Sequence, residues 1–286
     1  MVDKPAGLTS HDVVARVRRA VGGGKVGHAG TLDPFATGVL VVCLGAATRL
    51  AEWATAADKR YEAEVTLGVE TDTYDLTGTV VETRSVAGLD RAAIEQALTH
   101  FVGDVEQRPP PFSAIQVGGR RVYELARRGE AVELAPRRVT IHRLDIVGWE
   151  PPRLTLDVTC SKGTYVRSLA HDLGGALGTG AHVSSLRRLA SGRFGVDMAV
   201  PLDEVAATIA AGRGAELLQP LEWAVEELPR VDADAGDTAR LQHGQPIADA
   251  GAAVGRTARV HGPDGRLVAI VERREGAWWP SKVLAT

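Results

Sequence analysis

Asp33 is the side chain whose sequence setting best suits chemistry. It lies within residues 25–37, a stretch rich in Gly, Asp and Pro, and it precedes the apolar run 39–44. A carboxylate on a tightly turned loop held by a buried strand can act as a nucleophile or a base. For an isolated Asp33-Pro34 pair, the simpler interpretation is the start of a turn. His28 and Asp33 are too sparse for a metal cluster or for the paired acids of a carboxylate hydrolase.

Helices and strands on both sides must position this loop. Residues 9–12 have the order of a helix cap and precede valines at helical spacing, which predicts a helix that ends at the glycines 22–24. Apolar alternation predicts strands over 61–67 and 153–160, and helical spacing predicts helices over 90–102 and 165–177. The order is irregular, so we expect an α+β fold with a mixed, largely antiparallel central sheet flanked by helices and loops.

The composition of the chain changes after about residue 225. An Asp- and Ala-rich stretch is followed by short apolar segments at 256–261 and 267–272. We therefore expect two domains: residues 1–228 as the larger one, and residues 229–286 as a small β-rich one.

Charge is sorted along the chain although the net charge is only −3. Seven arginines and three glutamates lie between Arg120 and Arg143. These arginines, with Arg127 and Arg128 at their centre, form a candidate phosphate-binding patch. The alternative is a solvated helix face with ion pairs such as Glu124 to Arg127 and Arg128.

Composition indicates an ordinary globular protein of the cytoplasm. No apolar run approaches the roughly 20 residues that span a bilayer, and the first residues lack the pattern of a signal peptide. Cys43 and Cys160 each lie in an apolar, strand-like stretch, which favours two buried free thiols over a disulfide. We expect no membrane contact and no metal.

The segment around Asp33 resembles a known signature. Residues 26–40 read Val-Gly-His-Ala-Gly-Thr-Leu-Asp-Pro-Phe-Ala-Thr-Gly-Val-Leu, and this string resembles the catalytic loop of TruB-type tRNA pseudouridine synthases. The resemblance extends to Asp-Lys-Arg-Tyr at 58–61, Lys-Gly-Thr-Tyr-Val-Arg at 162–167 and Leu-Arg-Arg-Leu at 186–189. The end of the chain is similar to a PUA-type RNA-binding module.

The resemblance implies a function and a set of roles. The chain would isomerise one T-loop uridine of tRNA, at position 55 in tRNA nomenclature, without a cofactor. Asp33 would be the catalytic carboxylate that attacks a flipped nucleotide, and Arg167 would pair with it and lower its pKa. Tyr61 would stack on the extruded uracil. The remaining substrate-binding residues would be His28, Tyr165, Lys4 and Leu186, with Arg127 and Arg128 in an insertion at about 112–136 that folds over the T-loop.

Three alternatives remain open at this point. The first is a guide-RNA-dependent synthase resembling dyskerin, although this chain has no basic tail. The second is a tRNA-folding factor, which would use the same residues except Asp33. The third is the carboxylate hydrolase considered above. For a TruB-type enzyme we expect a monomer that binds the T-stem-loop of tRNA and needs no obligatory protein partner.

Overall fold

The computed structural model describes residues 1–112, 116–117, 120–121, 134–249, 251 and 254–284. The strands of the larger part are β1 Val2–Lys4, β2 Val26–Ala29, β3 Thr37–Leu44, β4 Lys59–Leu67, β5 Val69–Thr71, β6 Val80–Thr83, β7 Gly103–Gln107, β8 Gln116–Val117, β9 Arg120–Arg121, β10 Arg137–Glu150, β11 Arg153–Cys160, β12 Ala181–Ser191, β13 Phe194–Gly195 and β14 Val200–Pro201. The helices are α1 Ser10–Ala20, α2 Ala51–Ala56, α3 Arg91–Leu98, α5 Val166–Ala176, α6 Leu202–Ala210 and α7 Ala235–Gln242. Five short 3-10 helices are η1 Gly45–Leu50, η2 Thr99–Phe101, η3 Val196–Met198, η4 Gly214–Leu217 and η5 Leu221–Ala224.

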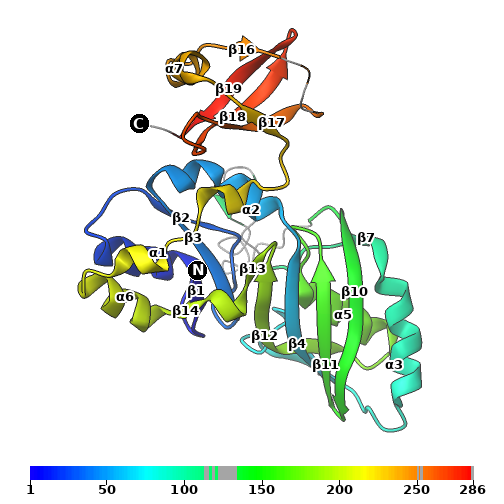
Figure 1. Ribbon diagram of the computed structural model, residues 1–286. Coiled ribbons are helices and arrows are strands. Elements are labelled where there is room, and N and C mark those ends of the chain that lie inside the picture. Colours follow the sequence, from blue (N-terminus) through cyan, green and yellow to red (C-terminus); the bar gives the residue numbers. More distant parts are fainter. Residues whose placement is uncertain (113–115, 118–119, 122–133, 250, 252–253, 285–286) are drawn as a thin grey trace.

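One large mixed sheet organises the first two hundred residues. Its strand order is β14-β1-β3-β12-β4-β11-β10-β7, with β2 paired to β3 and β13 paired to β12. Among these pairs only β1 with β14 and β12 with β3 are parallel, so the predicted α+β class and the largely antiparallel sheet are confirmed. Helix α5 packs on β12 and β4, and α3 packs on β10 and α5, whereas α1 and α6 lie together near β1 and β14 (Figure 1).

The predicted elements match the structure closely, with one difference. Thr9 caps α1, and its hydroxyl and Asp12 form the reciprocal capping box. The strands over 61–67 and 153–160 are β4 and β11, and the helix over 165–177 is α5. The helix predicted over 90–102 ends at Leu98 and continues only as the 3-10 turn η2, because Gly103 adopts a left-handed φ of 94° and starts β7.

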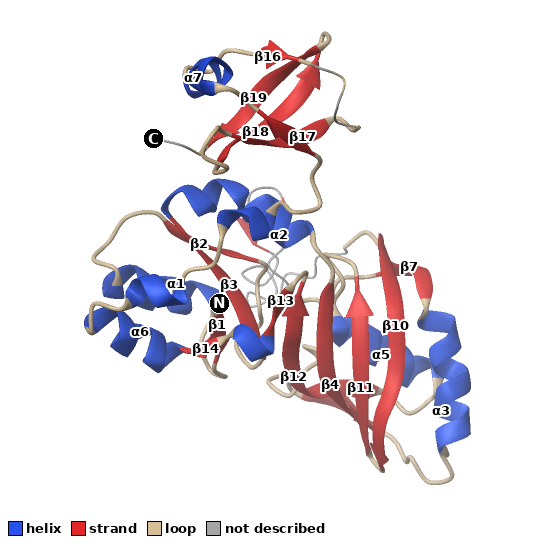
Figure 2. Cartoon of the chain, viewed as in Figure 1, coloured by secondary structure: helices blue, strands red, loops and turns tan. Residues whose placement is uncertain are grey.

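A second sheet is built from the last sixty residues. It contains β15 Arg230–Asp232, β16 Ile247–Ala248, β17 Thr257–His261, β18 Leu267–Arg274 and β19 Ala277–Val283. The β-rich character predicted for the C-terminal part is therefore confirmed, and Figure 2 shows this sheet with α7 beyond the α2 side of the larger part. The two parts share a small apolar cluster in which Leu50 packs with Val225, Leu267 and Ile270.

Cys43 and Cys160 are both buried free thiols, as expected. Across the described ranges, none of the helices is long and apolar enough to cross a membrane.

Candidate active site

The loop that carries Asp33 is held on both sides. It connects β2 to β3, which pair antiparallel from Val26 with Leu44 to Ala29 with Val41. The buried Lys4 ammonium donates to the Pro34 carbonyl at 3.2 Å and to the Leu8 carbonyl at 2.7 Å. The Ser10 hydroxyl at the start of α1 accepts from the Leu32 amide at 2.9 Å. The local hairpin and these contacts fix the position of the carboxylate before any ligand arrives.

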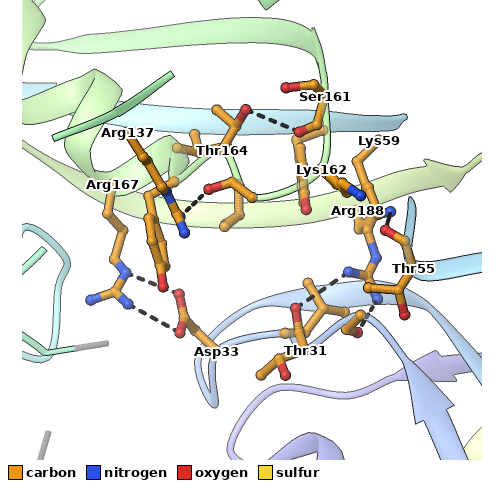
Figure 3. Close-up of a pocket in the computed structure, with 17 residues that line it drawn as sticks. Thr31, Asp33, Thr55, Lys59, Arg137, Ser161, Lys162, Thr164, Arg167 and Arg188 are labelled. Atoms are coloured by element: carbon orange, nitrogen blue, oxygen red, sulfur yellow. Dashed lines mark hydrogen bonds and ion pairs between the residues drawn. The ribbon is translucent and has the colours of Figure 1, made fainter. Parts of the chain in front are cut away.

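Arg167 lies opposite Asp33 in a charge-paired contact. Its Nε lies 2.9 Å from Asp33 Oδ2, and its Nη2 donates to Asp33 Oδ1 at 3.1 Å (Figure 3). The Arg167 side chain is 4% exposed and that of Asp33 is 31% exposed, so the arginine is the inner partner and the carboxylate faces the pocket. The planar guanidinium suits such a two-point contact, which a lysine could not reproduce.

Asp75 is a second acid on the same arginine, and sequence reasoning missed it. Arg167 Nη1 lies 3.2 Å from Asp75 Oδ2, and the Asp75 side chain is buried. The other carboxylate oxygen accepts from Thr73 and Thr77 hydroxyls and from the Thr77 amide. Residues 70–79 are rich in Asp, Thr and Gly, a composition that indicates a loop but no particular partner for Asp75. The guanidinium is therefore shared by one acid at the pocket and one acid behind it.

The net effect of this environment raises the pKa of Asp33. Removal of the carboxylate from water is the largest cause, and the nearby Asp75 adds to it. Arg167 acts in the opposite direction, as predicted, by favouring the ionised form. Burial outweighs the arginine, so the net pKa of Asp33 lies above its ordinary value.

Five of the predicted site residues line one pocket. Asp33, Tyr61, Tyr165, Arg167 and Leu186 come from the loop, β4, the start of α5 and β12, and they surround a cavity of about 320 Å³. Tyr61 is buried, and burial raises the pKa of its hydroxyl while Arg188 opposes the rise. The guanidinium of Arg137 stacks on the Tyr165 ring at 4.3 Å from its centre.

Lys4 and His28 are two predicted site residues that do not line the pocket. Lys4 is beneath the loop and not among the pocket-lining residues, so its contacts support Asp33 from behind. His28 lies on β2 with its ring edge-to-face with His11 at 5.6 Å, and it does not line the cavity. Burial and the neighbouring His11 lower the pKa of His28. Arg127 and Arg128 lie outside the described residues.

The described arginines of the 120–143 segment have different surroundings. Arg138 pairs with Asp104 at 2.8 Å, and Arg143 pairs with Asp145. Both of these arginines lie on β10 and not on a helix, so their ion pairs do not test the helix-face alternative. Arg137, in contrast, lines the pocket.

Gln107 is a further residue that the sequence did not indicate. Its amide side chain accepts from the Tyr165 amide at 2.7 Å and donates to the Tyr165 carbonyl at 3.0 Å. It is 3% exposed and ends β7. Because Tyr165 immediately precedes α5, this two-point contact sets both the Tyr165 ring and the start of the helix that carries Arg167.

Replacing Gln107 with Leu should weaken the fold and the reaction together. The variant leaves the Tyr165 amide without its partner, whereas the Tyr165 carbonyl still accepts from the Leu169 amide at 3.1 Å. We expect the loss to lower the free energy of unfolding by about 1–3 kcal/mol. Urea unfolding and single-turnover rates measure the two effects. Gln107→Glu keeps the acceptor for the Tyr165 amide, so its stability and its rate should fall less than those of Gln107→Leu. Unchanged stability and rate in Gln107→Leu would contradict the anchoring role.

Among the residues that the structure describes, no group of three or more His, Cys, Asp or Glu side chains could hold a metal ion. The described residues that line the pocket include one carboxylate, two tyrosines and several cations.

Comparison with known proteins identifies the class of this fold and site. The family model described as "TruB family pseudouridylate synthase (N terminal domain)" matches residues 18–166, and the "tRNA pseudouridylate synthase B C-terminal domain" matches residues 167–226. A solved structure titled as a Cbf5-Nop10-Gar1 complex matches with a TM-score of 0.79 and 29% identity, over 99% of this chain and 84% of that one. A structure of an H/ACA RNP bound to a substrate RNA containing 2′-deoxyuridine matches with a TM-score of 0.77 and 27% identity, over 100% of this chain and 84% of that one. The fold and pocket are those of a pseudouridylate synthase, an isomerase.

Curated relatives narrow the assignment. A protein of Symbiobacterium thermophilum called tRNA pseudouridine synthase B is 52% identical over 84% of this chain and 80% of its own length. One of the same name from Syntrophobacter fumaroxidans is 46% identical over 98% of this chain and 92% of its own. The chain belongs to the TruB family of pseudouridylate synthases.

Proposed function

We propose that this enzyme converts one T-loop uridine of tRNA, at position 55 in tRNA nomenclature, into pseudouridine, with Asp33 as the reacting carboxylate. The observation that supports this most directly is the contact of Asp33 with Arg167 at the wall of a pocket, in a chain whose family makes pseudouridine. The relatives described above are called tRNA pseudouridine synthase B, and we propose tRNA as the substrate because of this similarity.

The uridine must leave the RNA stack to reach Asp33, because the carboxylate lies in a pocket and not on an open surface. Tyr61 stacks on the flipped uracil, and Tyr165 and Leu186 line the same cavity. His28, on the strand before the loop, occupies the space that the flipped nucleotide leaves. Lys4 keeps the loop in place through Pro34.

Contacts to the rest of the RNA come from outside the pocket. Arg127 and Arg128, in the insertion at about 112–136, bind phosphates of the T-stem-loop without reading its sequence. Residues 1–228 form the catalytic domain, and residues 229–286 act as a PUA-like RNA-binding domain. Binding and releasing the T-loop region gives the protein a second role in tRNA folding.

The enzyme acts as a monomer without a cofactor or an obligatory protein partner. The solved relatives named above are found in complexes with Nop10 and Gar1, or with RNA in an H/ACA particle. The guide-dependent alternative therefore has to be separated by experiment.

The test uses the purified full-length protein alone with an unmodified T-stem-loop RNA. Carbodiimide mapping should detect pseudouridine at the single T-loop position, and an RNA with cytidine at that position should stay unmodified. Binding of the RNA without any product would instead favour the guide-dependent or folding-factor alternative.

A further inference from the structure

Lys59 and Arg188 form a second charged group in the pocket, apart from Asp33 and Arg167. Both line the same cavity as Asp33, and Figure 3 shows them beside Thr55 and away from the Asp33–Arg167 contact. Lys59 precedes Tyr61 by two residues on β4, so both side chains point to the same face. Arg188 lies on β12 directly opposite Tyr61. Lys59 is 6% exposed and Arg188 is 1% exposed.

Most hydrogen bonds of these two cations are with backbone carbonyls, and Arg188 also interacts with the Tyr61 hydroxyl. Lys59 Nζ donates to the carbonyls of Thr55 and Ala57. Arg188 donates to the carbonyls of Val39, Gly30 and Thr31 at 2.7, 3.1 and 3.4 Å, on both sides of the catalytic loop. These carbonyls satisfy hydrogen-bonding groups but do not neutralise charge.

No carboxylate within the described ranges forms an ion pair with Lys59 or Arg188, whereas Arg167 has two such partners. Burial and the neighbouring Arg188 lower the pKa of Lys59 to about 8. Two adjacent buried cations without an anion are unfavourable, and an anion that enters the pocket would relieve that cost. The free enzyme therefore holds an unneutralised positive site where its substrate binds.

Resting on the proposed function, we infer that Lys59 and Arg188 stabilise the uracil ring as an anion while it is detached from the ribose. With Asp33 engaging the ribose, the C1′–N1 bond breaks with its electron pair on the ring, and a carboxylate oxygen bonds to C1′. The ring turns, the pair forms the new bond from C5 to C1′, and the bond between C1′ and Asp33 breaks with its pair returning to the carboxylate. The C5 proton is lost and N1 gains one, so the atoms balance without an oxidant. Preorganised cations stabilise such developing charge most when water is excluded.

Burial separates this role from phosphate binding. A phosphodiester stays with the RNA backbone, outside the cavity that receives the base. Lys162, which also lines the pocket, is exposed and suits such a backbone contact. Lys59 and Arg188 are less exposed to solvent than Asp33, as expected for contacts to the base.

The experiment compares two leaving groups in one RNA. T-stem-loops with uridine or 5-fluorouridine at the target position are mixed with excess full-length enzyme, and consumption of the target nucleotide is timed. Fluorine at C5 withdraws electrons and stabilises the ring anion by itself. Lys59→Gln keeps a hydrogen-bond donor but loses the charge. It should lower the rate of uridine consumption by about 100-fold and the rate of 5-fluorouridine consumption far less. Lys59→Arg, which keeps the charge, should recover part of the loss, and RNA affinity should stay within about twofold of wild type.

Arg187→Gln is the matched control, because Arg187 is the next residue on β12 but pairs with Asp3 at 2.7 Å and does not line the pocket. It should leave the ratio of the two rates unchanged. Equal slowing of both substrates by Lys59→Gln would overturn the inference in favour of a purely structural role. Weaker RNA binding with an unchanged ratio would overturn it in favour of a phosphate contact. A wild-type enzyme that consumes neither RNA would instead overturn the proposed function, and this inference with it.

Discussion

Asp33→Asn should abolish pseudouridine formation while leaving RNA binding nearly intact. The substitution keeps the shape of the side chain but removes the carboxylate that faces the pocket, and we expect the single-turnover rate to fall by more than roughly 10⁴-fold, as for the loss of a nucleophile. Binding should persist or tighten slightly, because the variant removes one negative charge from a site that receives a polyanion. Rates with a T-stem-loop RNA and a filter-binding isotherm measure the two quantities.

Asp75→Asn provides a matched control for this prediction. It removes the same charge from the same arginine, but Asp75 lies behind Arg167 and does not line the pocket. We expect a loss of roughly 10- to 100-fold, the scale of a misplaced reacting group. If Asp33→Asn is no slower than Asp75→Asn, Asp33 has no role beyond holding Arg167.

Arg167→Met should affect stability and activity together. It leaves Asp33 and the buried Asp75 without their shared cation, and removing one partner of a buried ion pair typically costs about 3–5 kcal/mol. The effect should depend on pH with a definite sign. Without the arginine, the pKa of Asp33 rises further above its unfolded value, so the native state holds protons more tightly than the unfolded chain. The variant should therefore be penalised more at pH 8 than at pH 5, where protonation relieves the buried charge.

The same variant should shift the acid limb of the rate profile. Activity requires ionised Asp33. As the pH is lowered, the remaining rate of the variant should therefore begin to fall at a higher pH than the rate of the wild type. Arg167→Lys keeps the charge but cannot contact both acids through a planar guanidinium. Its stability and its acid limb should lie between those of the wild type and Arg167→Met. Urea unfolding at the two pH values and single-turnover rates across pH measure these effects. A variant with an unchanged acid limb and a pH-independent stability loss would show that Arg167 does not control the ionisation of Asp33.

Local patterns in the sequence predicted most of the elements of this fold. The capping order at Thr9 to Asp12 predicted α1, and strict alternation predicted β4 and β11. These patterns are readable because a half-buried strand or helix repeats its apolar residues with the period of its own backbone. The end of α3 was less readable, because the left-handed turn at Gly103 depends on a single glycine.

The class of enzyme and the loop of Asp33 could be predicted from the resemblance of one continuous string of residues to a known signature. Which charges share a site depends on how distant segments pack together. Asp75 reaches Arg167 from a loop 92 positions earlier in the chain, and Lys59 and Arg188 meet through the register of β4 with β12. Burial, which raises the pKa of Asp33 against the effect of its arginine, is likewise a property of the folded surroundings. Spacing along the chain cannot encode such effects, because they depend on strand pairing and on removal from water.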